Sequence, residues 1–533
     1  MTVLLELLGE VLSSPLLILE CLLGAAVVYL AVGVAWRLTF HPLAGYPGPL
    51  LAKVTDLYLA YHAWKGDRHL EFYRCHQKYG PVVRLGPNLL SFNTSTALKS
   101  IYGFKSNVRK SDFYTAFPAN KQTTNVHSTI DKSLHARKRR VISHAFADSA
   151  IKSMEKYVLG NIDTACNIIS DDVSTKRKAM ATNYYAEKTD SWSTPRNMAR
   201  WADWLTFDIM GDLVFGKAFG MLESPQNRFA IDLVSSAAKR HLICGTHLPI
   251  HNYHLDKLLF PAIAAKRTAY MSYSRAQSSA RTQLGTDSCD RKDFFFHLLN
   301  AHDPETGKGF SPAELWGESN LFIIAGSDTT STALAATLFY LVHDTSALKS
   351  ATAEVRAAFA NVNEVVAGAT LNECEFLRAC IDEAMRLSPP VPGALPRKVL
   401  EGGLLVDNVH VPAGVDVCVA HYAIHHNEAY YPRPFSYEPS RWMGDSEAAH
   451  AAFCAFSVGP RGCIGKGLAY VELMLSMARV LVQFDMRLAP GTSVGEGRED
   501  LEEGRKRGTE YQLKDTFTSI KDGPMVQFKG REI

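Results

Sequence analysis

The chain has 533 residues, 47% of them apolar, and its 57 basic residues nearly balance its 54 acidic ones. A net charge of +3 provides no strongly basic surface, so nucleic acid is not an expected partner. The ten cysteines are scattered without a C-x-x-C pair, which argues against a disulfide framework and against a zinc ribbon. The composition favours one large domain in a reducing compartment.

The first predicted element is a membrane anchor. The stretch from Val11 to Trp36 is apolar apart from Glu20, and about 20 such residues are enough to cross a bilayer. Basic residues such as Arg37 and Lys53 follow this stretch, so the positive-inside rule places the rest of the chain in the cytosol. A cleaved signal peptide is the alternative, but the basic start and small-residue cleavage site that it requires are weak here.

Three regions of the chain are expected on this basis. Residues 1–37 hold the single transmembrane anchor, and residues 38–50 form a connector. Prolines fix φ, so the Pro-rich sequence of this connector predicts a stiff, extended segment. Residues 51–533 form the catalytic domain.

The elements expected after the connector are mostly helices. A strand pair is predicted at 82–85 and 89–92, around a Gly-Pro-Asn turn. Apolar periodicity predicts helices over residues 133–146, 149–169, 196–215, 228–239, 347–359, 371–387 and 465–484. The polar stretch 171–194 and the charged run 495–507 are expected to be exposed loops. The predicted fold class is mainly α with small β-sheets.

The clearest helix start lies at Ser311. This serine as N-cap, Pro312 as first helical residue and Glu314 two positions later form a capping box, and the helix is expected to run to about Val342. Glycine costs about 1 kcal/mol relative to alanine inside a helix, so Gly326 predicts that another group packs against the helix backbone.

A glycine-rich loop, Phe456-Ser-Val-Gly459-Pro-Arg461-Gly-Cys463-Ile-Gly465, precedes the last predicted helix. A helix N-terminus favours the thiolate form of Cys463 through its dipole and free N–H groups. The glycines allow a flat cofactor to approach the backbone, where a Cβ atom would clash. Phe456 can shield the sulfur, and Arg461 can pair with a carboxylate. A cysteine taken singly is ordinarily a buried structural residue, but the spacing F-x-x-G-x-R-x-C-x-G favours a ligand.

With this loop the sequence resembles the cytochrome P450 superfamily, and in particular its fungal members of secondary metabolism. The resemblance implies a haem domain that binds haem b (iron protoporphyrin IX), with Cys463 as the axial thiolate ligand of the iron. A thiolate ligand favours O–O cleavage, which oxygen activation requires. Phe456, Gly459, Arg461 and Gly465 are then residues of the haem-binding loop.

A second family motif is Glu383-x-x-Arg386, whose spacing places both residues on one helix face. On its own this pattern is a common surface pair. In the family it forms a buried ion-pair network with an arginine from a later segment, here Arg441. The family's usual Pro-Glu-Arg sequence is Pro-Ser-Arg at that point, which leaves the local partner of Arg441 open.

Asp328 and Thr329 of the long capped helix correspond to the family's acid-alcohol pair. The resemblance implies that they deliver protons to iron-bound dioxygen, and an ordinary polar helix face is the alternative. His135 and Arg139 share a helix face, and together with Arg397 they match the family's haem-propionate ligands; surface charges are the alternative. A basic face for an electron donor, or simply a solvated face, is expected for Lys138, Arg140 and Lys466.

The function implied by the resemblance is monooxygenation of a hydrophobic small molecule, by hydroxylation or epoxidation. Electrons come from NADPH through a separate cytochrome P450 reductase, because no flavin or nicotinamide domain fits in this length, with cytochrome b5 as a second candidate donor. The protein is expected at the endoplasmic reticulum membrane with its catalytic body in the cytosol. Pocket walls are expected at residues 113–117, 322–325, 391–395 and 516–518.

Two alternatives remain. A haem-thiolate isomerase, dehydratase or ring-coupling oxidase keeps the cofactor and changes the chemistry. A haem-binding sensor without catalytic activity keeps only the cofactor, and it has no need of the acid-alcohol pair.

Overall fold

The computed structural model describes residues 15–118, 124–181, 192–284, 291–444 and 446–531. The mainly α fold with small sheets is confirmed. Helices in the first half of the chain are α2 (Pro15–Thr39), α3 (Leu50–Val54), α4 (Leu57–Lys65), α5 (Arg68–Tyr79), α6 (Ser95–Tyr102), α7 (Lys132–Ser143), α8 (Asp148–Ala181), α9 (Met198–Phe215), α10 (Phe229–Thr246), α11 (Leu248–Asn252), α12 (Asp256–Leu259) and α13 (Pro261–Leu284).

The second half contains the longest apolar helix and the helices that surround it. These are α14 (Phe294–Asn300), α15 (Pro312–His343), α16 (Thr345–Ala358), α17 (Ala369–Asn372), α18 (Glu375–Leu387), α19 (His421–His425), α20 (Glu447–Ala452) and α21 (Lys466–Gln483). Short 3-10 turns are η1 (Asp112–Ala116), η2 (His144–Phe146), η3 (Pro225–Asn227), η4 (Val362–Glu364), η5 (Pro439–Trp442) and η6 (Gly459–Arg461).

The strands form four small sheets. The largest has the order β1-β2-β8-β5-β3, from β1 (Val82–Gly86), β2 (Leu89–Phe92), β3 (Val108–Lys110), β5 (Arg397–Val399) and β8 (Asp416–Val419). The others are β4 (Arg196–Asn197), β12 (Met525–Gly530) and β9 (Phe484–Leu488); β6 (Leu404–Val406) with β7 (Val409–Val411); and β10 (Lys514–Thr516) with β11 (Thr518–Ile520). The predicted strand pair is β1 with β2, in antiparallel register with Val83 opposite Ser91.

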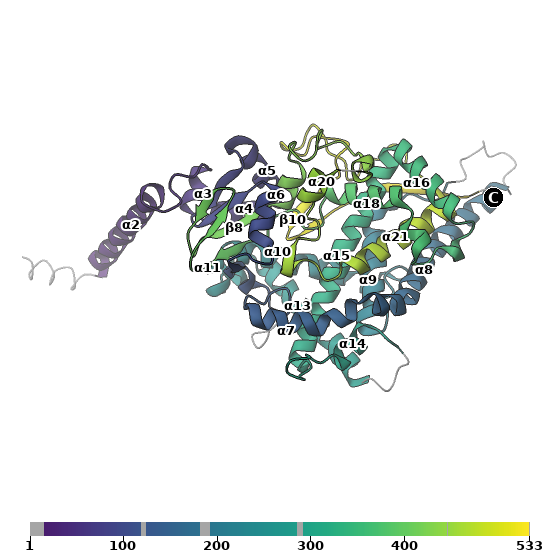
Figure 1. Cartoon of the computed structure of the whole chain (residues 1–533), viewed down its shortest axis with the longest axis horizontal. Helices are drawn as coiled ribbons and strands as arrows, with labels where there is room; N and C mark the ends of the chain where they lie inside the picture. Colours follow the sequence, from purple (N-terminus) through teal and green to yellow (C-terminus); the bar gives the residue numbers. More distant parts are fainter. Residues whose placement is uncertain (1–14, 119–123, 182–191, 285–290, 445, 532–533) are drawn as a thin grey trace, which may run out of the picture.

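Helix α15 runs through the middle of the molecule, with α9, α13, α18 and α21 packed around it (Figure 1). Its predicted capping box is confirmed: Glu314 N donates to Ser311 Oγ over 3.3 Å, and Ser311 N donates to Glu314 Oε2 over 3.0 Å. The helix is long and apolar enough to cross a membrane, but 72% of its apolar window is buried inside the protein. It is therefore the core helix of the domain.

Helix α2 differs from α15 because none of its residues is buried. It projects from one end of the molecule, next to α3 and α4 (Figure 1). The predicted span began at Val11, and its first residues lie outside the described part of the chain. From Pro15 onward, the predicted apolar helix is present as expected.

Three sequence-based expectations about local structure are wrong. The connector is not extended throughout, because Ala44 N donates to His41 O over 2.8 Å in a turn that buries Leu43. Residues 171–181 continue α8 instead of forming a loop. This segment contains no Gly or Pro and is rich in Lys, Arg and Ala, which favour helix even on an exposed surface. The predicted helix 371–387 is two helices, α17 and α18.

Candidate active site

An apolar cavity of about 290 Å³ lies between α15 and the glycine-rich loop. Helix α15 contributes residues from Asn320 to Ala333, and the loop and the start of α21 contribute residues from Ala455 to Leu473. The tip of the β10–β11 hairpin and the segment between α18 and β5 complete the wall. Elements that are far apart in the sequence thus meet around one space.

Cys463 reaches this space from the end of the loop. Its backbone N–H donates to Phe456 O over 2.9 Å, which closes the loop immediately before α21. The side chain is solvent-accessible because it lines the cavity. Burial raises the pKa of the thiol, and a backbone N–H from Gly465 with the charges of Arg139 and Lys466 only partly opposes this rise. The net direction is opposite to the one that the sequence predicts from the helix dipole alone.

The glycines of the loop have different roles. Gly459 has φ +70°, and a Cβ atom there would lie 2.0 Å from the carbonyl oxygen of Tyr102. Its neighbour is therefore protein backbone and not the cavity, in contrast to the sequence-based expectation. Gly465 does line the cavity, and a Cβ atom there would meet nothing closer than Phe146 at 3.7 Å. Gly465 thus leaves open space beside Cys463.

A cluster of cationic side chains surrounds one side of the loop. Arg461 lines the cavity and donates to Thr129 O over 2.7 Å, and Arg139 donates to Gly462 O over 2.8 Å. Arg397 donates to Leu395 O over 3.1 Å. Burial and then the charge of Arg397 lower the pKa of Arg461 to about 10. Burial and then Arg461 lower the pKa of His135 to about 3.

Lys110 belongs to the same cluster, and sequence reasoning missed it. It is buried and donates to His127 O, with its ammonium 3.9 Å from the centre of the Tyr114 ring. Burial and the charges of Arg397 and Arg461 hold its pKa well below the usual lysine value. A single lysine at the end of a short strand gives no sequence signal that it belongs to a buried cationic cluster.

The cluster and the thiol together fit a flat, dianionic, metal-containing cofactor. None of the cations Lys110, Arg139, Arg397 and Arg461 forms an ion pair with a carboxylate of a described residue. Buried cations without a counter-charge are costly, so an anionic group beside Arg461 would stabilise them. A thiol is a soft metal ligand, and the cavity into which Cys463 opens is mainly apolar. The donor set therefore fits haem, whose carboxylates would face the cations and whose iron would face Cys463.

Asp328 and Thr329 lie on different sides of α15. Thr329 lines the cavity, and its Oγ1 donates to Ala325 O over 2.6 Å. Asp328 is buried away from the cavity lining, where desolvation raises its pKa and the nearby Lys521 opposes the rise. Lys521 in turn pairs with Asp203 over 2.6 Å.

Gly326 is packed as the sequence predicts, and the group that packs against it is Met210 of α9. A Cβ atom at Gly326 would lie 2.6 Å from the Sδ and Cε atoms of this methionine. Both residues also line the cavity.

Glu383 and Arg386 are fully buried and pair over 2.8 Å. Arg441 lies 3.2 Å from Glu383, and Trp442 Nε1 donates to the same carboxylate over 3.0 Å. The local partner that the sequence left open is Glu438, 3.0 Å from Arg441. Glu438 thus lies immediately before Pro439, at a position that the Pro-Ser-Arg pattern does not include.

The predicted pocket walls are only partly those of the cavity. Of residues 113–117 only Phe117 lines it, and Thr516 does not. The cavity is also lined by residues that sequence reasoning missed, namely Asn125, His127, Met210, His241, Asn320 and Glu472.

The predicted basic face is wrong for Lys138. This lysine is fully buried and pairs with Glu318 over 3.2 Å and with Glu314 over 3.1 Å. Arg140 pairs with Asp303 over 3.1 Å, which leaves Lys466 as the exposed cation of the three. The helical pattern alone could not show that Lys138 faces inward, because its acidic partners lie on another helix.

Fold and site together define a mainly helical protein built around an apolar cavity that an accessible cysteine thiol and a group of cations border. The sequence profile of the cytochrome P450 family matches residues 47–502. Cytochrome P450 monooxygenase AKT7 of Alternaria alternata is 39% identical over 534 residues, covering 97% of this chain and 99% of that protein. Cytochrome P450 monooxygenase poxM of Penicillium oxalicum is 39% identical over 532 residues, 98% of each chain. Cytochrome P450 monooxygenase atnE of Emericella nidulans is 39% identical over 525 residues, 96% of each chain.

The chain belongs to the cytochrome P450 family. It is accordingly a monooxygenase, and membership of the family implies a haem cofactor. The resemblance to fungal members is confirmed, since all three relatives come from fungi.

Proposed function

We propose that this protein inserts one oxygen atom from O2 into a hydrophobic small molecule, a fungal secondary-metabolite intermediate, with Cys463 as the axial ligand of haem b. The observation that carries the proposal is the accessible Cys463 thiol at the wall of an apolar cavity, beside buried or half-buried cations that pair with no carboxylate of a described residue. When bound, haem supplies the activation of O2 with electrons from NADPH, so that the second oxygen atom leaves as water.

The residues of the chain would hold the cofactor and handle protons. Arg461, Arg397 and Arg139 neutralise and orient its carboxylates, neutral His135 donates an N–H to them, and Phe456 lines the cavity beside Cys463. Thr329 presents its hydroxyl to the cavity, and Asp328 holds a proton reserve behind it. Its raised pKa supports this role, because a carboxyl group that retains its proton more readily is a better general acid near neutral pH.

The substrate side of the cavity is mainly apolar. Phe117, Phe322, Leu395 and Phe517 contribute apolar surface there. Such a lining suits a hydrophobic molecule with few polar groups. Hydroxylation and epoxidation both fit this arrangement.

The redox partners and the location of the protein are part of the same proposal. Electrons reach the protein from a separate NADPH–cytochrome P450 reductase, or from cytochrome b5, with Lys466 available on the surface next to the loop. Helix α2 anchors the protein in the endoplasmic reticulum membrane, and the domain that follows the connector lies in the cytosol. The unburied apolar surface of α2 supports the anchor.

The test is the absorption spectrum of the reduced, CO-bound protein. A strongly red-shifted Soret band is expected for thiolate-ligated haem, and Cys463→Ala is expected to remove this band together with the activity. Retained turnover in Cys463→Ala, or no haem band in folded protein supplied with haem, would refute the proposal. For an isomerase, dehydratase or coupling oxidase, the product formed under oxygen-18-labelled O2 would carry no label.

A further inference from the structure

We propose that the buried ion pair between Arg68 and Asp515 is a clamp that fixes two segments of the cavity wall, which makes Arg68 a positioning residue for substrate selection. The proposal rests on the proposed function, because it concerns the same cavity. It involves α5 near the start of the domain and the β10–β11 hairpin near its end.

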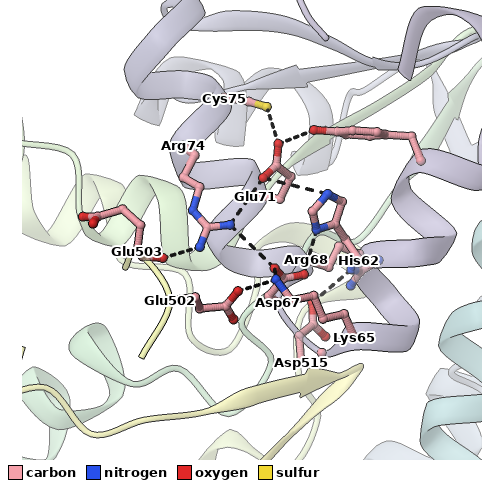
Figure 2. Close-up of polar contacts among 12 residues, drawn as sticks. His62, Lys65, Asp67, Arg68, Glu71, Arg74, Cys75, Glu502, Glu503 and Asp515 are labelled. Atoms are coloured by element: carbon pink, nitrogen blue, oxygen red, sulfur yellow. Dashed lines mark hydrogen bonds and ion pairs between the residues drawn. The ribbon is translucent and has the colours of Figure 1, made fainter. Parts of the chain in front are cut away.

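The clamp is almost inaccessible to solvent. Arg68 Nε lies 3.0 Å from Asp515 Oδ2, and the two side chains are 5% and 0% exposed. Figure 2 shows the pair beside a larger polar network, in which Asp67 contacts His62 over 2.7 Å and Lys65 over 2.8 Å. Lys65 also pairs with Glu502, so that α4 and α5 are tied to the segment before the hairpin.

The first segment that the clamp fixes is the tip of the hairpin. Asp515 Oδ1 accepts a hydrogen bond from Phe517 N over 3.0 Å, while Oδ2 accepts from Arg68. Phe517 has φ +84°. Residues other than glycine rarely adopt this backbone conformation, so it needs support from its surroundings. The Phe517 ring lines the cavity, and its centre lies 4.9 Å from the centre of the Phe117 ring. Asp515 thus links the guanidinium to the aromatic wall.

The second segment is the one between α18 and β5. A Cβ atom at Gly393 would lie 2.1 Å from Arg68 Nη2 and 2.7 Å from Asp515 Oδ2, so the backbone at Gly393 packs directly on both members of the pair. The neighbouring Val391 and Leu395 line the cavity. His421, another lining residue, donates its N–H to Gly393 O over 3.1 Å.

These contacts make the shape of the wall depend on the guanidinium. Arg68 Nη2 is buried and has no hydrogen-bond partner in the described part of the chain, so its place is set by packing against Gly393 and by the Nε bond to Asp515. The lysine ammonium is compact and has no planar guanidinium that could contact Asp515 and Gly393 together, so lysine does not replace arginine here. Without the clamp, the positive φ at Phe517 relaxes and the ring leaves its place in the wall.

The experiment measures two dissociation constants on the full-length haem-loaded protein, by absorbance titration. Imidazole is a small probe that reaches only the iron, whereas clotrimazole is an imidazole with a triphenylmethyl group that also contacts the walls. For Arg68→Met, Asp515→Asn and Gly393→Ala, we expect the Kd of clotrimazole to rise at least about fivefold and that of imidazole to stay within about twofold. Arg68→Lys is expected to restore little.

Two comparisons separate positioning from general destabilisation. Arg281→Met breaks a pair of similar burial, Arg281 with Asp293 at 4% and 0% exposure and 3.1 Å, away from the cavity lining. It is expected to lower the Tm comparably and to leave the ratio of the two constants unchanged. The double variant Arg68→Met/Phe517→Ala is expected to change the clotrimazole Kd by less than the product of the two single effects, because one of the two segments fixed by Arg68 acts through Phe517.

The clamp is overturned if the ratio of the constants is unchanged in Arg68→Met and Gly393→Ala, or if Arg281→Met changes it equally. Strictly additive effects in the double variant would contradict the route through Phe517. A wild-type protein whose haem spectrum does not respond to imidazole would instead contradict the proposed function, so the two failures are distinguishable.

Discussion

Glu472 on α21 is a buried carboxyl group that faces the cavity, and its Oε2 atom has no hydrogen-bond partner among the described residues. Burial raises its pKa from the ordinary 4.5 to about 8. The folded protein therefore keeps this proton at a pH where the unfolded chain has released it. By linkage, protonated Glu472 contributes fully to the free energy of unfolding below about pH 4.5, and this contribution is lost as the pH rises towards 8.

The variant Glu472→Gln tests this linkage. Glutamine keeps the shape and has no proton to release, so the decline between about pH 4.5 and 8 should be absent from the variant. We expect the Tm of the variant minus that of the wild-type protein to increase steadily with pH over this range. A constant difference would mean that Glu472 titrates at its ordinary pKa.

Residues such as Cys463 and Glu472 show how far the sequence predicts a site. Cys463 was predicted because its neighbours at fixed spacing form a local motif. Glu472 and Lys110 were missed because each stands alone among residues whose pattern only indicates helix or strand. Their burial depends on other elements, and a single sequence does not show which elements those are.

At the scale of elements, Arg386 joins α18 to the irregular segment before the glycine-rich loop. The Arg386 guanidinium pairs with Glu383 and also donates to the carbonyl oxygens of His425 over 2.8 Å and Pro434 over 2.7 Å. Removing one partner of such a network leaves a buried charge and several acceptors unpaired. The network therefore contributes to the placement of the loop as well as to stability.

We expect Arg386→Met to lower the free energy of unfolding by about 3–5 kcal/mol. The control is Lys266→Met, which breaks an exposed pair with Asp232 and should cost less than about 1 kcal/mol. Urea denaturation followed by fluorescence measures both. Equal losses in the two variants would show that the buried network contributes no more than a surface pair.

The contact between α15 and α9 at Gly326 gives a second test. Gly326→Ala gains about 1 kcal/mol in helix propensity but places a methyl group against Met210, and overpacking costs about 1–3 kcal/mol. We expect a net loss of stability in the wild-type background and a neutral or stabilising effect in a Met210→Ala background. Thermal unfolding of the four proteins in this cycle provides the measurement, and equal effects in both backgrounds would exclude the clash.

The elements themselves were predicted where the signal is local. The capping box at Ser311 fixes the start of α15, and the turn between β1 and β2 fixes a strand pair. The polar pattern of residues 171–176 predicts a loop because a helix segment on the surface has no apolar stripe to mark it. The charged run 495–507 was expected to be a solvated loop, yet Arg505 is buried and donates to Leu513 O over 2.7 Å beside the hairpin.

At the scale of the whole molecule, exposed apolar surface continues beyond α2. Leu50, Leu51, Leu57, Tyr61 and Trp64 of α3 and α4 are each between 53% and 66% exposed. These helices lie at the same end of the molecule as α2 (Figure 1). Exposed apolar groups gathered next to an exposed apolar helix favour contact with a bilayer surface.

We expect a chain that lacks residues 1–39 to keep part of its binding to phospholipid vesicles in flotation assays. Replacing Leu50, Leu51 and Trp64 with serine in the truncated chain should abolish the remainder. Serine substitutions at Leu405, Phe229 and Val366 serve as a control, since these side chains are also exposed but do not belong to α3 or α4. Truncated protein that never floats with vesicles would contradict this role.

The ion pair between Arg68 and Asp515 joins residues 447 positions apart in the chain. At a synthesis rate of about 5–20 residues per second, roughly 20–90 s separate the appearance of the two partners on the ribosome. Cys463 precedes Asp515 by 52 residues, about 3–10 s of synthesis, so only in those last seconds are the thiol and α15 present while Arg68 still lacks Asp515 and the wall still lacks Phe517. The cavity therefore takes its final shape only late in synthesis, and a few seconds separate the appearance of Cys463 from the closing of the wall beside it.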